Sequence, residues 1–212
     1  MYDTIEAMPS VESRSVAEHQ HTGPSRLWQR LALGIVLLIS IFMNFYQLGQ
    51  NGFANLYYAS AIRSMLDSWH NFFFVSFDPG GFVSIDKPPL GFWLQAASAK
   101  IFGFTPFSIF LPQALAGVLS VLLLYYIVRR HFGIVAGLLA ALSLAISPIS
   151  VLTNRNNTID STLVLVMLLG AWAVLQAAET GKLRWLLLCA VLLVWDSILR
   201  CSRLTWSYPL MA

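Results

Sequence analysis

Residues 107–152 read FSIFLPQALAGVLSVLLLYYIVRRHFGIVAGLLAALSLAISPISVL, and this stretch decides the fold class. It contains two apolar runs, Phe107–Val128 and Gly133–Leu152, which are separated only by a short loop containing Arg129, Arg130 and His131. Each run has roughly the 20 residues that a helix needs to cross the hydrocarbon layer of a membrane. The pattern therefore predicts two membrane spans joined by a tight basic turn.

Further apolar runs lie on either side of this pair. One covers Leu31–Leu48, another covers Thr162–Ala178, and a fifth begins at Trp185 but stays apolar only to Trp195. Of the 212 residues, 57% are hydrophobic and 11% are charged, whereas soluble domains carry about 25% charged residues. We therefore expect an all-α polytopic membrane protein with about four to five transmembrane helices.

The charges indicate a topology. Basic residues flank the predicted spans at one end, at Arg26, Arg30, Arg129, Arg130, Lys182 and Arg184. The positive-inside rule places these residues, and hence the N-terminus, in the cytoplasm of a multi-pass protein of the cell membrane. Residues 1–25 are polar and are predicted to form a disordered cytosolic tail. The net charge of +3 is small, and we expect no nucleic-acid partner.

The segment after the first span is predicted to be a structured outer loop. It is rich in aromatic residues, which favour the membrane–water interface. Apolar residues recur there at helical spacing, at Tyr58, Ile62, Met65, Leu66 and Trp69. This spacing predicts one interfacial helix, and residues Pro89–Phe102 are predicted to form a second.

The predicted topology brings charged residues from two segments to the outer face. The outer loop carries Asp86 and Lys87, and the turn before the fourth span carries Arg155 and Asp160. A carboxylate there could act as a general base or bind a divalent cation, and a basic group could bind phosphate. Two structural roles remain open: Asp86 could pair with Lys87 or cap a turn, and Asp160 could cap the fourth span.

These segments together resemble the GT-C membrane glycosyltransferases of the protein O-mannosyltransferase and aminoarabinose-transferase type, which are similar to glycosyltransferase family 39. The resemblance covers about Leu31 to Val194. Three stretches carry it: Tyr57-Tyr58-Ala59 with Arg63-Ser64-Met65-Leu66, then Ile85-Asp86-Lys87-Pro88-Pro89-Leu90-Gly91-Phe92-Trp93, and Arg155-Asn156-Asn157-Thr158-Ile159-Asp160. The Asp-Lys-Pro-Pro-Leu-Gly-Phe-Trp run is the most specific of them.

The resemblance implies a hexosyltransferase or mannosyltransferase that uses a polyprenyl-phosphate-linked sugar donor in the membrane lipid and an acceptor on the outer face. It implies catalytic roles for Asp86 and Asp160, which are also the possible ligands of a divalent cation. Lys87 and Arg155 would bind the donor phosphate. The side chains expected to line the cavity are Asn55, Tyr57 and Tyr58.

One position departs from the family pattern. The best-known branches carry an Asp-Glu pair just before the first outer helix, where this chain reads Phe53-Ala54-Asn55-Leu56. Asn55 can form hydrogen bonds but cannot be a base. We therefore expect Asp86 or Asp160 to take more of that role.

The predicted organisation ends abruptly. Residues 26–194 are interpreted as the N-terminal part of a GT-C transmembrane domain, and residues 195–212 as an aberrant tail produced by a frameshift. A fragment of this kind is expected to be inactive alone, because half of its cavity wall would be missing. The alternative interpretations are a piece of a membrane transporter and a non-catalytic membrane subunit.

Overall fold

The computed structural model describes residues 26–50 and 52–191. Within them the elements are α1 (Arg26–Phe45), α2 (Leu56–Met65), α3 (Trp69–Phe74), α4 (Pro89–Phe102), α5 (Pro106–Ile146), α6 (Pro148–Asn154) and α7 (Asp160–Thr180). A further helical segment covers residues 183–191. The predicted all-α membrane class is confirmed. The predicted tails, 1–25 and 195–212, lie outside the described residues.

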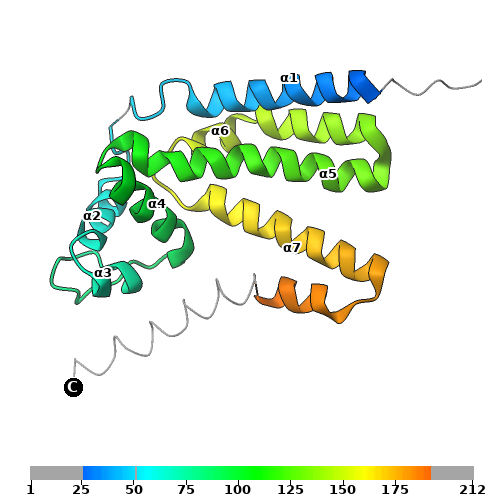
Figure 1. Cartoon of the computed structure of the whole chain (residues 1–212). Coiled ribbons are helices and arrows are strands. Elements are labelled where there is room, and N and C mark those ends of the chain that lie inside the picture. The colour runs from blue at the N-terminus through cyan, green and yellow to red at the C-terminus, as the bar shows by residue number, and fades with distance from the viewer. Residues whose placement is uncertain (1–25, 51, 192–212) are drawn as a thin grey trace, which may run out of the picture.

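Helix α5 is a hairpin of two arms rather than one rod. Its 41 residues are broken at Gly133, whose φ of 87° is non-helical, a backbone conformation that glycine adopts readily. Arm 106–132 therefore turns back into arm 134–146 at one end of the bundle (Figure 1). The predicted basic turn is confirmed, and the first arm covers the predicted span Phe107–Val128, whereas the second arm ends at Ile146, before the predicted boundary at Leu152.

Three described helices are long and apolar enough to cross a membrane: α1 over Leu27–Phe45, α5, and α7. Helix α1 ends three residues before the predicted boundary at Leu48, because the chain turns at Gln47 with a φ of 53°. The predicted third span, to Leu152, is also interrupted. Pro148 opens α6 and holds Ser147 in an extended conformation, as expected for a residue before proline.

Helix α1 packs against both arms of α5. The buried cluster there joins Val36 of α1 to residues of both arms, namely Val121, Tyr125, Ala141 and Ala145. Small residues on the second arm of α5 allow α1 to approach it closely. Such close packing drives helix association in lipid, because no hydrophobic force acts between helices there. The α5 hairpin is therefore the centre of the bundle, and it also contacts α4, α6 and α7.

A buried polar contact reinforces this packing. The Asn154 Nδ2 of α6 donates to the Asn44 Oδ1 of α1 at 2.8 Å, and Asn44 Nδ2 donates to the Ser40 carbonyl oxygen at 2.8 Å. The Asn154 side chain also lies against Gly117 of α5, where an added Cβ would come within 2.6 Å of its Cγ. Gly117 therefore leaves the space that the amide pair occupies.

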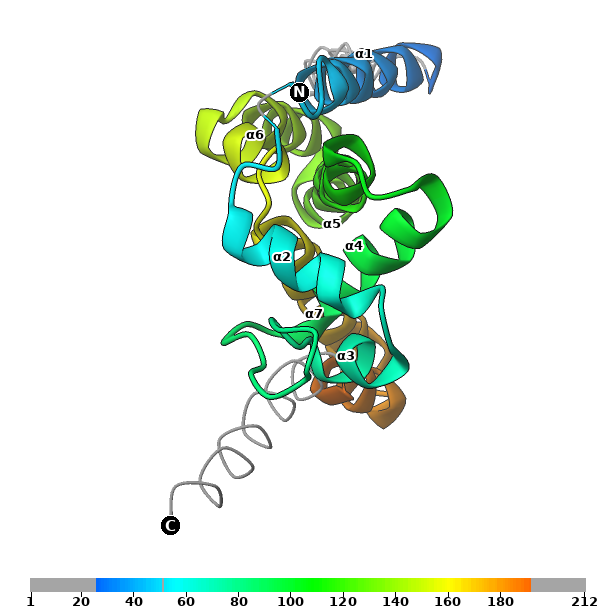
Figure 2. The same cartoon turned by 90° about the vertical axis from the view of Figure 1, so that its left-hand side faces the viewer.

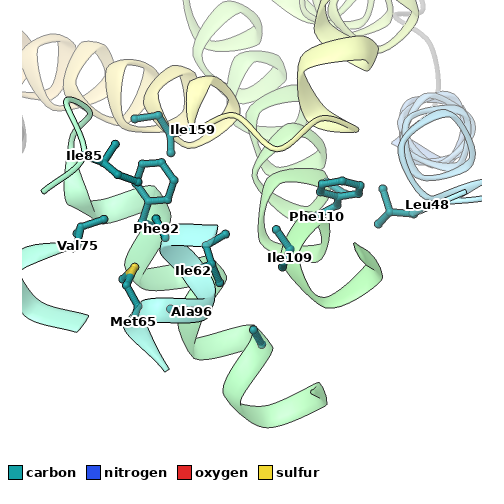
Figure 3. Close-up of a cluster of buried hydrophobic side chains, with 13 residues drawn as sticks. Leu48, Ile62, Met65, Val75, Ile85, Phe92, Ala96, Ile109, Phe110 and Ile159 are labelled. Carbon is teal, nitrogen blue, oxygen red and sulfur yellow. The ribbon is translucent and has the colours of Figure 1, made fainter. Parts of the chain in front are cut away.

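The three short helices α2, α3 and α4 gather at the end of the bundle opposite the α5 turn (Figures 1 and 2). A second buried cluster holds them to α5, with Ile62 of α2, Phe92 of α4 and Ile109 of α5 almost wholly inaccessible (Figure 3). The predicted helix over Pro89–Phe102 is confirmed. The single helix predicted to reach from Tyr58 to Trp69 is wrong, because the Ser68 side chain accepts from Asn71 N and begins α3.

Substituting Gly117 tests the packing around the amide pair. We expect Gly117→Ala to lower the free energy of unfolding by about 1–3 kcal/mol, the usual cost of overpacking, because Asn154 must move away from Asn44. Thermal unfolding of the purified chain in detergent measures this. The control is Gly34→Ala in α1, where an added Cβ meets nothing within 4 Å. Equal stability of the two variants would contradict the packing described.

The cap of α2 gives a second prediction. Asn55 Oδ1 accepts from Tyr57 N at 3.0 Å and caps this helix. Asn55→Ala should cost about 1 kcal/mol, whereas Asn55→Asp should cost only a few tenths, because aspartate caps helices as well as asparagine does. The same unfolding measurement compares them. A cost of Asn55→Asp as large as that of Asn55→Ala would argue against the cap.

Candidate functional site

Two acidic residues from distant parts of the sequence lie at the end of the bundle that carries α2, α3 and α4. Asp86 lies in the turn before α4, and Asp160 is the first residue of α7. Both residues are exposed. Because α4 contacts α7, the starts of these two helices are brought together.

A close contact between Gly91 and Ile159 fixes this arrangement. A Cβ added at Gly91 would lie 2.6 Å from Ile159 Cγ2, so any larger residue would push α4 and α7 apart. Ile159 also belongs to the buried cluster with Ile85 and Phe92 (Figure 3). Each of the two acids thus directly follows a buried isoleucine of the same cluster.

Both acids affect the pKa of the Tyr58 hydroxyl. Burial raises the pKa of this phenol above its usual value, and the negative charges of Asp86 and Asp160 raise it further. The pKa of Tyr57 is raised by burial and then by Asp86 and Tyr58. Both phenols are therefore neutral at physiological pH and can donate a hydrogen bond. The structure thus brings together four of the predicted site residues.

Aromatic contacts hold these two tyrosines on α2. The Tyr57 ring stacks on Phe77 with centroids 4.8 Å apart, and the Tyr58 ring lies 5.3 Å from that of Phe92. Phe92 is wholly buried. The rings thus anchor the tyrosines through their apolar parts, as amphipathic aromatic side chains permit.

Neither acid has the local structural role that the sequence left open. Among the described residues, Asp86 forms no ion pair with Lys87, and the cap position of α4 is Pro88, without a side-chain hydrogen bond. Asp160 lies in the first turn of α7 but supplies no capping hydrogen bond, although its charge is favourable at a helix N-terminus. Both carboxylates therefore remain available to a ligand.

The turn before α7 is tied to α2 and α4 through Asn157. Its Nδ2 donates to the Asn55 carbonyl oxygen at 3.2 Å, and its Oδ1 accepts from Gln95 Nε2 at 3.3 Å. Asn157 and Gln95 are fully buried. Neither residue was among those predicted for the site. Gln95 is a polar residue within the apolar helix α4, and Asn157 is a polar residue in the short turn before α7. This polar character is the signal that could have suggested a contact.

The two predicted phosphate-binding residues have different surroundings. Lys87 is exposed and has no ion-pair partner in the described part of the chain. Arg155 follows α6 and is half-buried, and its Nη1 donates to the Met43 carbonyl oxygen of α1 at 3.5 Å. This contact is long and weak. Arg155 is thus directed toward the end of α1, whereas Lys87 adjoins Asp86.

A third acid at this end, Asp78, has a structural role. Its carboxylate accepts from Val83 N at 2.7 Å and from Phe82 N at 3.2 Å. These hydrogen bonds hold the pKa of Asp78 below its usual value. Asp78 also lines a groove of about 490 Å³ beside Leu56, Ser60 and Arg63 of α2. This groove does not include Asn55, Tyr57 or Tyr58, so their placement in a cavity wall stays a prediction.

The possible metal site stays a prediction as well. The described residues contain no group of three or more His, Cys, Asp or Glu side chains placed to share a metal ion. Asp86 and Asp160 would offer two carboxylates, and a divalent cation usually has additional oxygen ligands. Any such ion would therefore need ligands from substrate phosphate or water.

Comparison with known proteins identifies the family to which this chain belongs. Residues 86–196 match the family described as dolichyl-phosphate-mannose-protein mannosyltransferase, and the match begins at Asp86. The chain is 51% identical over 156 residues to a Bacillus subtilis protein named "Putative mannosyltransferase YycA", over 74% of this chain and 23% of that protein. It is 45% identical over 157 residues to "Putative mannosyltransferase YkcB" of the same organism, over 74% and 22%.

A more distant relative is an uncharacterized protein of Aquifex aeolicus, which is 28% identical over 162 residues, covering 74% of this chain and 32% of that protein. No solved structure matches the chain. The chain spans about a quarter of the length of the two Bacillus relatives. The matches agree with the predicted resemblance, and the chain belongs to the dolichyl-phosphate-mannose-protein mannosyltransferase family of GT-C membrane glycosyltransferases.

Proposed function

We propose that this chain forms part of an enzyme that transfers a hexose from a polyprenyl-phosphate-linked donor to an acceptor at the end of the bundle where α2, α3 and α4 lie. The observation that carries the proposal is the packing of Ile85 and Ile159 in one buried cluster at the Gly91 contact, which brings Asp86 and Asp160 to the same end of the bundle as Tyr58. Asp86, Asp160 and Lys87 are exposed and form no ion pair with the residues that the structure describes, and sugar transfer from a phosphate donor requires such carboxylates and such a cation.

The chemistry follows from these groups. An acceptor hydroxyl loses its proton to the carboxylate of Asp86 or Asp160 as its oxygen forms a bond to the anomeric carbon of the sugar. The bond between that carbon and the phosphate oxygen breaks, and polyprenyl phosphate leaves with the bonding electrons. Lys87 stabilises the negative charge on the leaving phosphate. The neutral Tyr58 hydroxyl donates a hydrogen bond to bound substrate.

Arg155 is proposed as the second phosphate contact. The guanidinium has five N–H donors, and its weak bond to the Met43 carbonyl oxygen uses one of them. The remaining donors suit the fork geometry of phosphate binding. A divalent cation at Asp86 and Asp160 is part of the same proposal, since it would neutralise the donor phosphate.

The proposed topology puts this site on the outer face of the cell membrane and the N-terminus in the cytoplasm. The α5 turn with Arg129 and Arg130 lies at the opposite end of the bundle (Figure 1), together with Arg30 at the start of α1. The positive-inside rule supports this orientation. We also propose that transfer needs more of the length that the two Bacillus relatives have, so that residues 1–212 alone are inactive.

Loss of the Asp86 carboxylate provides the direct test. A chimera in which this chain to residue 190 continues with the rest of YycA should transfer radiolabelled mannose from polyprenyl-phosphate-mannose in membranes. We expect Asp86→Asn in this chimera to lower the rate by about 10²–10⁴, the usual contribution of a general base. Asp160→Asn should also lower it, and Lys87→Gln should lower the rate as well as raise the donor KM, because Lys87 stabilises the charge that develops on the leaving phosphate.

The matched control is Asp67→Asn, which removes an exposed acid of the same outer segment. The Asp67 side chain forms no hydrogen bond or ion pair with the described residues. Its rate should stay within about twofold of the parent, a surface substitution of small effect. If the Asp86→Asn chimera transferred mannose as fast as the Asp67→Asn chimera, a catalytic role for Asp86 would be excluded. A folded chimera with no transfer from any polyprenyl-phosphate sugar would favour the transporter or non-catalytic interpretation.

A further inference from the structure

The end of the bundle opposite the candidate site contains a basic hollow that the transfer reaction does not use. It lies between α1 and the turn of α5 and has a volume of about 630 Å³. Its lining residues are Gln29, Arg30, Leu33, Tyr125, Tyr126, Arg129 and Ile134. The lining contains two arginines and no acid, so an anionic ligand would be favoured there.

Arg129 is held in place without neutralisation of its charge. Its Nη1 donates to the Tyr125 hydroxyl at 3.1 Å, and its Cζ lies 5.6 Å from the centre of the Tyr125 ring. The buried ring of Tyr125 therefore orients the guanidinium through a hydrogen bond and a cation–π contact. Neither Arg129 nor Arg30 has a carboxylate partner among residues 26–50 and 52–191.

The adjoining hollow on the other side of Tyr126 differs in charge. It has a volume of about 650 Å³ and lies between α5 and α7. There Glu179 forms an ion pair with Arg130, and its second carboxylate oxygen lies 3.8 Å from His131 Nε2. Glu179 thus pairs with Arg130, whereas Arg129, which lines both hollows, and Arg30 form no ion pair within the described part of the chain.

We propose that the hollow between α1 and α5 binds the phosphate of an anionic phospholipid through Arg30 and Arg129. Arginine forms bidentate contacts with phosphate, and basic pockets between transmembrane helices bind anionic lipid headgroups. Leu33 and Ile134 provide apolar surface for the lipid beside the charges, and the exposed ring of Tyr126 suits the interface region. This mixed lining favours a lipid over a free anion.

Native mass spectrometry of the purified chain in detergent tests the proposal. Phosphatidylglycerol and phosphatidylcholine with identical acyl chains are titrated separately. We expect phosphatidylglycerol to bind preferentially, and the double variant Arg30→Gln/Arg129→Gln to bind it roughly ten- to thirtyfold more weakly, from about 1 kcal/mol for each basic residue. Inorganic phosphate at the same concentrations should compete little if the acyl chains contribute.

The matched control is Lys182→Gln/Arg184→Gln, which removes the same charge from exposed positions outside the hollow. It should keep the affinity for phosphatidylglycerol. An equal loss in both double variants would overturn the proposal and indicate non-specific attraction, and full displacement by inorganic phosphate would overturn the lipid assignment. If the first double variant fails to fold, the same titrations are made with two other variants. These are Arg30→Lys/Arg129→Lys, which keeps both charges, and the single variant Arg30→Gln.

Discussion

The close approach of Gly91 to Ile159 is the constraint on which the candidate site depends. The absence of a side chain at Gly91 lets α4 lie against the start of α7, with an added Cβ only 2.6 Å from Ile159 Cγ2. Asp160 directly follows Ile159, and Asp86 directly follows Ile85 of the same cluster. Packing of two buried isoleucines on Phe92 therefore sets the relative positions of two carboxylates that remain in contact with solvent.

The rest of the bundle is held by similar means. Lipid gives no hydrophobic drive between helices, so small residues and interhelical hydrogen bonds must specify the packing. Asn154, Asn44 and Gly117 supply both at the junction of α6, α1 and α5, and Thr162 donates to Gln113 Oε1 at 3.1 Å between α7 and α5. Interhelical hydrogen bonds average about 0.6 kcal/mol each in membranes, so they contribute mainly by selecting one arrangement.

The apolar runs predicted the long helices and the basic turn, because the length and apolar character of a run indicate whether it can cross a membrane and the flanking charges indicate its direction. Boundaries were less predictable. Trp69 continued the helical spacing of α2, but the local hydrogen bond of Ser68 to Asn71 started a new helix. The pairing of Asp86 with Asp160 followed from topology and resemblance. The link through Asn157 to Asn55 and Gln95 did not, because no pattern in one sequence indicates which buried amides meet across about 60 to 100 residues.

The two ends of the bundle differ in their charged groups, and this difference underlies the separate roles that we propose for them. At one end, Asp86 and Asp160 form no ion pair with any described residue. Burial raises the pKa of Tyr57 and Tyr58, Asp86 raises both further, and Asp160 raises that of Tyr58. At the other, Arg30 and Arg129 have no carboxylate partner in the described ranges 26–50 and 52–191, while Arg130 is paired with Glu179. A donor with a phosphate between a sugar and a long lipid needs acids at the sugar and a cation at the phosphate. Among the described residues, the first end has two carboxylates and an adjacent lysine without ion-pair partners, whereas Glu179 at the other end is paired with Arg130, so the first end is where we place transfer.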